Sequence, residues 1–502
     1  MKIVLASSEV VPFAKTGGLA DVAGALPREL EKLGHKVSIF MPGYQGVEEA
    51  AGRAGLSVEP TDATFEIPIG NTIETGRIAR STLPNSNADI YFVQHSGFFQ
   101  REGIYSDQGH DYQDNCERFV FFCRSVLESI RVFDLRPEVI HANDWQTGLI
   151  PALLACEYRD NPMYESIASL LTIHNLAYQG LFDYRHMAST GLDPHYFNWE
   201  QMEYYGQLNL LKTGIVFADA INTVSPTYAM EIQTSEQGCG LESVLQHRSE
   251  RLSGILNGID TDDWNPATDQ YLPHHFDANF EAEMGSPGKA ECKRALQVES
   301  KLDPNPDVPL IGIVGRLATQ KGWSLIIPVL KEWLANFDAQ WVILGTGEQE
   351  YHAVLSSLHR EHPDKLSLVL GFSNPLAHRI EAGSDLFLMP SRYEPCGLNQ
   401  MYSMAYGTLP LVRQTGGLAD TVIDTTPESL ADGTATGFSF EAFSAEALGA
   451  CLHRAIKLYH DDRKQWNQIM LNGMRRDWSW GASAAAYESL YRQTIEYHLG
   501  TT

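Results

Sequence analysis

The chain lacks long apolar runs, and none reaches the ~18 residues that a membrane-spanning helix needs. Its opening segment MKIVLASSEV contains only the four-residue run Ile3–Ala6. Polar Ser7, Ser8 and Glu9 follow at once, which favours a first β-strand over a signal peptide. We therefore expect neither a secretory leader nor a membrane partner.

Basic residues are scarce, because 37 Lys and Arg stand against 63 Asp and Glu, for a formal net charge of −26. Binding to a nucleic-acid backbone requires a basic face, and anionic membranes attract polybasic segments. The composition argues against both partners. A phosphorylated small molecule stays compatible, since a few local cations suffice, and a neutral polysaccharide would not be repelled.

The seven cysteines include no Cys-x-x-Cys pair, and their number is odd. This pattern favours a reduced chain, so we expect a cytoplasmic protein. His274 and His275 have no spaced carboxylate partner, so the sequence predicts no metal site. The Asp260–Asp262 segment matches a metal–nucleotide pattern, but nearby glycine and proline favour a turn in an irregular connection.

Short apolar runs alternate with helical patterns along most of the chain, and the alternation pauses between Thr261 and Asp307. It predicts an α/β fold with right-handed crossovers and mostly parallel sheets. The 502 residues exceed one core, so we place a domain boundary near residue 265. The predicted strands are Ile3–Ala6, Lys36–Met41, Ile90–Val93, Glu138–Ala142, Ser169–Ile173 and Ala220–Val224, then Pro309–Val314, Trp341–Leu344, Leu366–Leu370, Asp385–Met389 and Thr408–Val412.

The hexapeptide Thr-Gly-Gly-Leu-Ala-Asp occurs twice, at 16–21 and at 415–420, each time between an apolar run and a helical pattern. Loops at the carboxyl ends of parallel strands are where open α/β sheets bind ligands, and amides at a helix start can hold a phosphate. We interpret the copies as two glycine-rich loops offered to one shared site. The alternatives are chance, or a favourable loop-to-helix sequence in which Asp21 and Asp420 each gain ~0.3–1 kcal/mol from a helix dipole.

Two cations follow the predicted strand 309–314. Arg316 offers a planar fork and Lys321 a point charge, a combination that suits a diphosphate. The alternative is a solvated loop. Gly345 and Gly347 follow the next strand and could let a phosphate or a base approach the backbone, although glycine turns are common.

Polar residues also end two strands of the first half. His174 follows the predicted strand 169–173, and Asp144 follows 138–142. Both would lie at the ligand-binding edge of the sheet. The alternatives are a structural histidine and, for Asp144, an N-cap of the helix after Trp145.

Taken together, these segments resemble bacterial glycogen synthases and plant starch synthases, which are retaining glycosyltransferases of the two-Rossmann-domain (GT-B) kind that use ADP-glucose. The likeness covers nearly the whole chain. It is carried by Lys15–Asp21, His141–Trp145, Thr172–Asn175, Val224–Tyr228, Asn257–Asp260, Gly315–Gly322, Glu394–Leu398, Thr415–Gly417 and Asp477–Trp480.

The resemblance implies two Rossmann-like domains facing a deep cleft. Residues 1–265 would form the acceptor-glucan side, completed by a C-terminal helix, 482–502, that crosses back. Residues 266–481 would bind the nucleotide sugar. The implied enzyme, a retaining hexosyltransferase, moves glucose from ADP-glucose to the non-reducing end of an α-1,4-glucan and releases ADP. The acceptor would be glycogen, starch or a malto-oligosaccharide, and no cofactor or metal is implied.

The resemblance also assigns roles. Arg316 and Lys321 would bind the diphosphate and Glu394 would hold sugar hydroxyls. His174 would lie near the anomeric carbon, acting through its side chain or its backbone carbonyl. These four are the implied catalytic residues. The implied substrate-binding residues are Lys15, Gly17, Gly18, Asp21, Asp144, Asn257, Gly345, Gly347, Cys396, Gly397, Leu398, Thr415, Gly416 and Gly417.

Two positions qualify the likeness. Many GT-B enzymes carry a second acid eight residues after the first, and here that residue is Tyr402, as in the synthases. Asn399 resembles plant starch synthases more than some bacterial members, so a glycogen or a starch-like product stays open, as does a granule-bound starch synthase in a plastid. A UDP-glucose-using GT-B transferase is an alternative enzyme. A non-catalytic glucan-binding protein would be expected to have lost residues that this chain keeps. Oligomeric state is left open.

Overall fold

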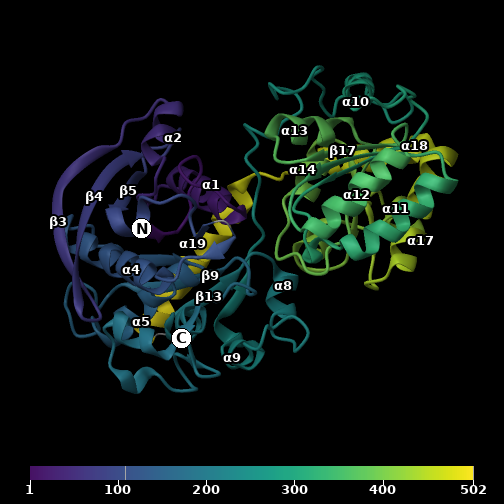
Figure 1. Cartoon of the computed structure of the whole chain (residues 1–502). Coiled ribbons are helices and arrows are strands. Elements are labelled where there is room, and N and C mark those ends of the chain that lie inside the picture. Colours follow the sequence, from purple (N-terminus) through teal and green to yellow (C-terminus); the bar gives the residue numbers. More distant parts are fainter. Residues whose placement is uncertain (108, 501–502) are drawn as a thin grey trace. The chain divides into compact units, whose positions relative to one another are not determined.

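Two compact units make up the molecule (Figure 1). The computed structural model describes residues 1–107 and 109–500. Met1–Asn257 and the C-terminal segment from Trp480 form the first unit, and Gly258–Ser479 form the second. Among the residues described, no helix is long and apolar enough to cross a membrane.

The first unit is built on a sheet with the strand order β14-β13-β9-β8-β1-β2-β5-β4-β3. The strands from β14 to β5 pair in parallel, and β4 and β3 extend them antiparallel. The bounds are β1 (Lys2–Ala6), β2 (Lys36–Pro42), β3 (Glu59–Ile69), β4 (Thr72–Thr82), β5 (Asp89–Gln94), β8 (Val139–Asn143), β9 (Ala168–Ile173), β13 (Ala220–Thr223) and β14 (Leu252–Gly254). Central strands are buried on both faces, which explains their continuous apolar runs.

The hairpin of β3 and β4 was not predicted. Side chains of β3 alternate between buried and exposed, with Phe65, Ile67 and Ile69 facing inward. Pro60 and Pro68 lie at exposed positions of this strand and argue against a central strand. They are tolerated because β3 lies at the edge of the sheet.

Helices and small sheets complete this unit. The helices are α1 (Gly18–Lys32), α2 (Val47–Arg53), α3 (Ser96–Phe99), α4 (Asn115–Val132), α5 (Leu149–Cys156), α6 (Met187–Thr190), α7 (Leu210–Phe217), α8 (Pro226–Glu231), α9 (Glu242–His247) and α19 (Trp480–Leu499). The further strands are β6 (Ser106–Asp107), β7 (His110–Asp111), β10 (Leu181–Asp183), β11 (Glu203–Tyr204) and β12 (Gln207–Asn209). Short 3₁₀ segments are η1 (Trp145–Thr147), η2 (Tyr184–His186), η3 (Pro194–Tyr196) and η4 (Ser249–Arg251).

The last helix, α19, belongs to the first unit and contacts α1 and β9 (Figure 1), which confirms its predicted return. A buried polar chain fastens it to the sheet. The hydroxyl of Thr172 donates to Asn222 Oδ1, so its oxygen accepts from His141 Nε2 at 2.5 Å. The other ring nitrogen, Nδ1, then accepts from the Tyr491 hydroxyl at 2.9 Å. Burial lowers the pKa of His141 to about 3, so the ring is neutral.

Replacing Tyr491 by phenylalanine is expected to lower the free energy of unfolding by about 1–2 kcal/mol, because it leaves the buried Nδ1 of His141 without a donor. Urea denaturation followed by circular dichroism measures this. Tyr497→Phe on the same helix is the matched control, because the Tyr497 hydroxyl makes only exposed contacts. Equal stability of the two variants would show that the His141 contact does not hold α19.

The second unit contains, in its described residues, a wholly parallel sheet in the order β17-β16-β15-β18-β19-β20. The strands are β15 (Leu310–Val314), β16 (Gln340–Gly345), β17 (Leu366–Leu370), β18 (Leu386–Met389), β19 (Leu409–Arg413) and β20 (Phe438–Phe440). The helices are η5 (Thr319–Lys321), α10 (Pro287–Glu299), α11 (Trp323–Asn336), α12 (Gln349–Glu361), α13 (Asn374–Gly383), α14 (Asn399–Ala405), α15 (Gly416–Thr421), α16 (Pro427–Ala431), α17 (Ala445–Asp461) and α18 (Arg463–Met474). Two units with parallel-core sheets confirm the predicted α/β class.

An aromatic stack holds the irregular segment after Gly258 on the second unit. The ring of Trp264 lies between His378 and Tyr402, with centroid distances of 3.8 and 3.7 Å. Beneath it, Asp269 accepts from His378 Nδ1 at 2.7 Å and from the Tyr406 hydroxyl at 2.6 Å. Tyr402, the residue in place of a second acid, thus packs against the chain that enters this unit.

Candidate functional site

The carboxyl edge of the first sheet gathers the polar residues that follow three neighbouring strands. Strands β9, β8 and β1 are adjacent and parallel, so their carboxyl ends lie at one edge. His174 follows β9, Asp144 follows β8 and Glu9 lies just beyond β1. The sheet therefore places His174 and Asp144 at one edge and adds Glu9, a carboxylate that was not predicted.

Asp144 uses its carboxylate to fix the loop that carries His174. Its backbone is left-handed, with φ of 57°, and its side chain makes no helix-capping bond. Oδ1 instead accepts the backbone N–H of His174 at 2.7 Å. Asp144 thus occupies the N-cap position of η1, but its carboxylate serves the His174 loop and makes no capping bond. Burial raises the pKa of Asp144 to about 7, and the negative charge of Glu9 contributes in the same direction.

The imidazole of His174 is held as a neutral group. Asn143 donates through Nδ2 to the carbonyl of Ala6 at 3.1 Å, which directs its Oδ1 toward His174 Nε2 at 2.9 Å. Nε2 must then carry the proton. Burial lowers the pKa of His174 to about 3. A neutral ring that is already hydrogen-bonded cannot act as an imidazolium acid near neutral pH.

The first glycine-rich loop is open. An ion pair of 2.7 Å joins Lys15, which is about half exposed, to Asp21, which is about a quarter exposed, and a pair this close to solvent contributes little to stability. Gly17 is the N-cap of α1 and receives no side-chain cap, and Gly18 is the first helical residue. A Cβ added at Gly17 would meet no heavy atom within 4 Å in the described structure. Packing therefore does not require glycine there.

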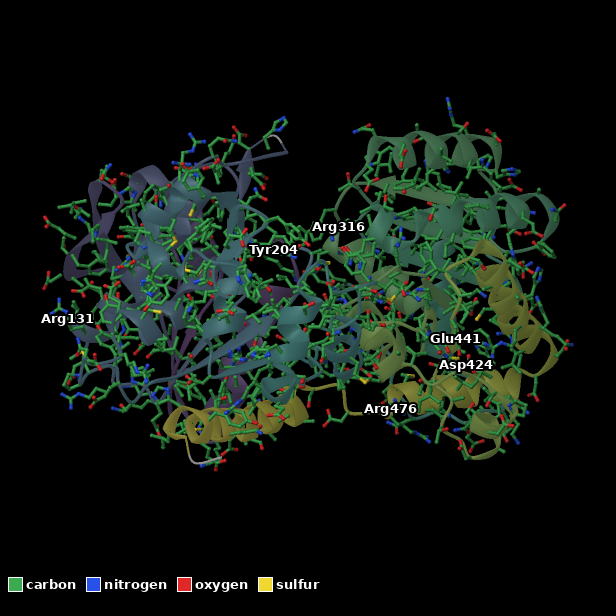
Figure 2. The ribbon with its side chains drawn as sticks, turned by 90° about the horizontal axis from the view of Figure 1, so that it is seen from below. Arg131, Tyr204, Arg316, Asp424, Glu441 and Arg476 are labelled. Atoms are coloured by element: carbon green, nitrogen blue, oxygen red, sulfur yellow. The ribbon has the colours of Figure 1, made fainter. Side chains whose placement is uncertain are left out.

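In the second unit, the loops after β15 and β18 bring together two predicted catalytic residues. Lys321 Nζ lies 2.6 Å from Glu394 Oε2, and the Ser391 hydroxyl donates to the same oxygen at 2.9 Å. Glu394 is buried and Lys321 is about a quarter exposed. Arg316, which Figure 2 labels, is exposed at the same strand-end edge. It donates to Gln320 Oε1 at 3.0 Å. The pairing of Lys321 with Glu394 was not predicted.

Gly345 and Gly347 allow two backbone loops to touch. A Cβ at Gly345 would lie 2.0 Å from the carbonyl of Gly315, and one at Gly347 would lie 2.3 Å from that of Leu317. The N–H of Gly347 donates to His352 Nε2 at 3.0 Å. These glycines thus shape the loop that carries Arg316, and the Gly347 amide is already engaged.

The second glycine-rich copy is packed beneath the Glu394 loop. A Cβ at Gly416 would lie 2.1 Å from the Glu394 carbonyl, and one at Gly417 would lie 2.0 Å from that of Cys396. The Gly417 N–H donates to the carbonyls of Glu394 and Pro395 at 3.2 and 3.1 Å. This amide is therefore not available to a phosphate. Asp420, expected in a first helical turn, lies beyond it in the short α15.

Comparison with known proteins gives consistent matches over the whole chain. Residues 2–247 match the family described as starch synthase catalytic domain, and residues 297–470 match glycosyl transferases group 1. The chain is 47% identical to glycogen synthase 2 of Geobacter sulfurreducens over 100% of both proteins. It is 45% identical to the glycogen synthase of Rhodopirellula baltica, over 99% of this chain and 98% of that one.

The chain belongs to the glycogen and starch synthase family. The catalytic domain of starch synthase IV from Arabidopsis thaliana, solved bound to ADP and acarbose, superposes with a TM-score of 0.88 at 33% identity over 99% of each chain. Sucrose-phosphate synthase from Thermosynechococcus elongatus, at 17% identity and a TM-score of 0.59, shares the fold over 98% of each chain.

The loop around Glu394 is rigid in this synthase because side chains from the following helix tie it down. Gln400 donates to the carbonyls of Cys396 and Gly397 at 3.1 and 3.0 Å. Gly397 needs its left-handed φ of 72°, and Leu398 is the N-cap of α14. Asn399 donates to Val314 of β15 at 3.0 Å, which links the Glu394 loop to the Arg316 loop.

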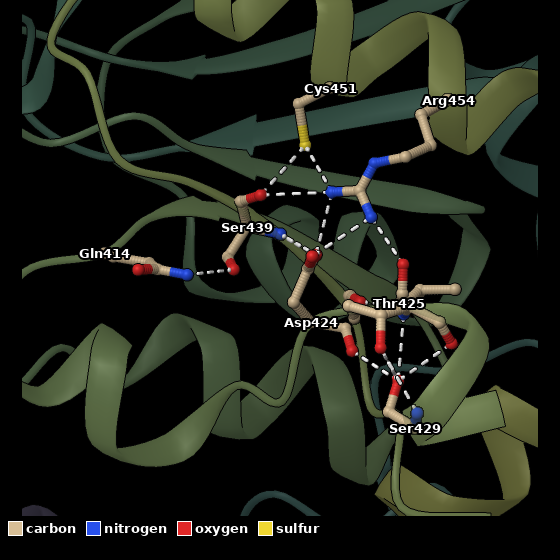
Figure 3. Close-up of polar contacts among 9 residues, drawn as sticks. Gln414, Asp424, Thr425, Ser429, Ser439, Cys451 and Arg454 are labelled. Carbon is tan, nitrogen blue, oxygen red and sulfur yellow. Dashed lines mark hydrogen bonds and ion pairs between the residues drawn. The ribbon is translucent and has the colours of Figure 1, made fainter. Parts of the chain in front are cut away.

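A second network fixes the chain just before Thr415 in the synthase (Figure 3). Arg454 of α17 donates to both oxygens of Asp424, at 2.8 and 3.0 Å. Asp424 accepts the Ser439 N–H at 2.6 Å, and the Ser439 hydroxyl accepts from Gln414 at 2.9 Å. Arg454 of α17, which lies later in the chain, thus anchors the loop that carries Thr415.

Three residues of the synthase that support the site were not predicted: Glu9, Asn143 and Ser391. Glu9 follows a strand and could have been found by the position that singled out Asp144. Asn143 acts on His174, a partner distant in sequence, and no local signal marks it. Ser391 acts on Glu394, which is near in sequence, but a serine in a strand-end loop carries no signal of that bond. Asn257 was predicted, and its buried Oδ1 has no hydrogen-bond partner within the residues that the structure describes.

Proposed function

We propose that the protein is a glycogen synthase that transfers glucose from ADP-glucose to the 4-hydroxyl at the non-reducing end of an α-1,4-glucan, with retention of configuration and release of ADP. The identity of 44–47% to full-length glycogen synthases carries this proposal. The solved relative bound to ADP and acarbose supports a nucleotide and an α-glucan as ligands here. The cytoplasmic location and a glycogen rather than a starch-like product stay predictions.

In this proposal, the second unit binds the donor. Arg316 and Lys321 stabilise the negative charge that develops on the diphosphate as the glycosidic bond breaks. Glu394 binds sugar hydroxyls, and its ion pair with Lys321 sets the separation between the sugar and phosphate subsites. No step in this mechanism requires a metal, because the cations are supplied by the chain.

The first unit supplies the surroundings of the anomeric carbon. The His174 ring is neutral, and its Nε2 is hydrogen-bonded to Asn143. We therefore assign the stabilisation of positive charge at the anomeric carbon to the His174 backbone carbonyl. The loop holding that carbonyl is fixed by Asp144. Lys15 and the amides at the start of α1 approach the donor phosphates. The acceptor binds on this unit.

The decisive experiment incubates the purified protein with glycogen and either ADP-glucose or UDP-glucose. We expect release of ADP, growth of chains that an α-1,4-specific amylase degrades, and a kcat/KM at least ~10-fold higher for ADP-glucose. A small sugar such as glucose is the control acceptor and should support little transfer. No ADP release with glycogen, or a preference for UDP-glucose, would overturn the proposal.

A further inference from the structure

Glu9 is a buried carboxylate that the reaction described above does not use. It is 3% exposed and lies just beyond the carboxyl end of β1. Its Oε2 accepts the backbone N–H groups of Thr16 and, at 3.3 Å, Gly17. Its Oε1 accepts the hydroxyls of Thr16 and Tyr105, each at 2.6 Å. Four donors converge on one side chain.

Neighbouring hydroxyl groups fix the position of the Glu9 backbone and of the Tyr105 hydroxyl that binds its carboxylate. The Ser7 hydroxyl donates to the Glu9 carbonyl at 2.6 Å, and Ser8 bonds to the Tyr105 hydroxyl at 2.7 Å. Hydrogen bonds to an ionised acceptor are about twice as strong as neutral ones. A carboxylate that accepts four such bonds is therefore a stiff anchor for whatever donates to it.

What donates to Glu9 is the glycine-rich loop. Thr16 and Gly17 immediately precede α1, whose N-cap has no side-chain cap of its own. Gly17 has open space where a Cβ would stand, so side-chain packing does not restrain this part of the loop. The conformation of the segment between Lys15 and Gly18 is thus set mainly by its bonds to Glu9.

We propose that Glu9 is a positioning residue, which holds Lys15 and the first amides of α1 in the geometry that binds the phosphates of the nucleotide sugar. This inference rests on the proposed function, since it concerns the same donor. A buried negative charge near a phosphate would ordinarily weaken binding. Here four hydrogen-bond donors partly neutralise the carboxylate charge. The gain in affinity from an ordered loop then exceeds the loss from the remaining repulsion between Glu9 and the phosphates.

A carboxylate suits this position because two of its partners are backbone N–H groups, which only donate, and because its charge strengthens all four bonds. Glutamine has the same shape, but it keeps the four contacts only if its oxygen faces the two N–H groups and the two hydroxyls turn to accept from its nitrogen, and these bonds lack charge assistance. Glu9→Gln therefore weakens the hold on the loop while the core around it keeps its volume. Weaker bonds to the loop should lower the affinity for the nucleotide sugar about tenfold, which corresponds to about 1.4 kcal/mol.

The test compares wild type, Glu9→Gln and the control Glu66→Gln, a substitution at an exposed site on β3 of the same unit. We expect Glu9→Gln to raise the KM for ADP-glucose about 10-fold and to leave the KM for glycogen unchanged. Amide hydrogen exchange should accelerate in the peptide containing Thr16 and Gly17, and not elsewhere. The control should match wild type in both measurements.

Two further variants keep the outcome decisive. Tyr105→Phe removes one of the four bonds and should raise the same KM by a smaller factor. Thr16→Val removes only the hydroxyl bond and replaces Glu9→Gln if that variant unfolds. Unchanged KM for ADP-glucose and unchanged exchange in the variants that fold would overturn the inference.

The two proposals can fail separately. If wild type elongates no glucan from ADP-glucose, the proposed function fails, while hydrogen exchange still reports whether Glu9 orders the loop. In that case unchanged exchange at Thr16 and Gly17 in Glu9→Gln would overturn the inference as well. If wild type is active, the KM split between donor and acceptor decides it.

Discussion

Lys321→Ala is expected to lower kcat for glucan elongation at least ~100-fold while the fold survives, because removing one preformed donor from a transition-state charge typically costs ~2.7–4 kcal/mol. The substitution also leaves the buried carboxylate of Glu394 without its cation, 2.6 Å away in the intact protein. Initial rates of ADP release at saturating glycogen and ADP-glucose measure the effect, and circular dichroism checks the fold.

The matched control is Lys331→Ala, an exposed lysine on α11 of the same unit, which should retain wild-type kcat. Arg316→Ala should lose at least ~100-fold as well. Combining Lys321→Ala with Glu394→Gln should give less than the sum of the single effects, because the second change removes the orphaned charge. Near-normal turnover in both Lys321→Ala and Arg316→Ala would remove the leaving-group argument.

The parallel strands could be predicted because a strand that is buried on both faces requires a continuous apolar run in the sequence, as in β8 and β9. The β3–β4 hairpin was not predicted because one of its faces is exposed and because Pro60 and Pro68 argue against a strand in the sequence. Position at a sheet edge, which makes those prolines acceptable, is a property of the assembled sheet.

The glycine-rich copies show how little an identical hexapeptide fixes. Gly17 stands in open space, whereas Gly416 and Gly417 are required because backbone carbonyls of the Glu394 loop approach within 2.1 Å of where a Cβ would be. The Thr16 and Gly17 amides bond to a carboxylate, and the Gly417 amide bonds to main-chain carbonyls. Strand-end position was enough to locate these loops, but their roles depend on partners distant in sequence.

Contacts between site residues could not be predicted from the sequence either. Sequence position placed Lys321 and Glu394 on strand-end loops, and the adjacency of β15 and β18 then brought them into an ion pair. For His174, the sequence left the side chain and the carbonyl as equal candidates. The hydrogen bond between its ring and Asn143 supports the proposed role of the carbonyl, and this bond forms only in the folded chain.

Asp144→Asn is expected to lower kcat ~100-fold, because a neutral amide oxygen replaces the charged acceptor that holds the loop of His174 through the His174 N–H. A loop displaced by ~1 Å from the reacting atoms can cost about two orders of magnitude in rate. Rates of ADP release at saturating substrates measure it. Asp160→Asn, an exposed substitution in the same unit, is the control.

The same residue predicts a pH dependence with opposite signs for activity and stability. Burial raises the pKa of Asp144 from 3.8 to about 7. The ionised form is the stronger acceptor of the His174 N–H, so kcat should fall as the pH drops through about 7. The folded protein binds the additional proton between about pH 4 and 7, so its free energy of unfolding should decrease as the pH rises across that window.

Asp144→Asn should remove both trends, since asparagine does not titrate. The remaining activity of this variant should not change between about pH 6 and 8 through any titration at position 144. A variant that kept the acid limb of the wild-type profile would assign that limb to another group. The opposite signs follow from one cause. The site keeps a carboxylate where burial disfavours its charge, because the charged form is the one that fixes the His174 carbonyl.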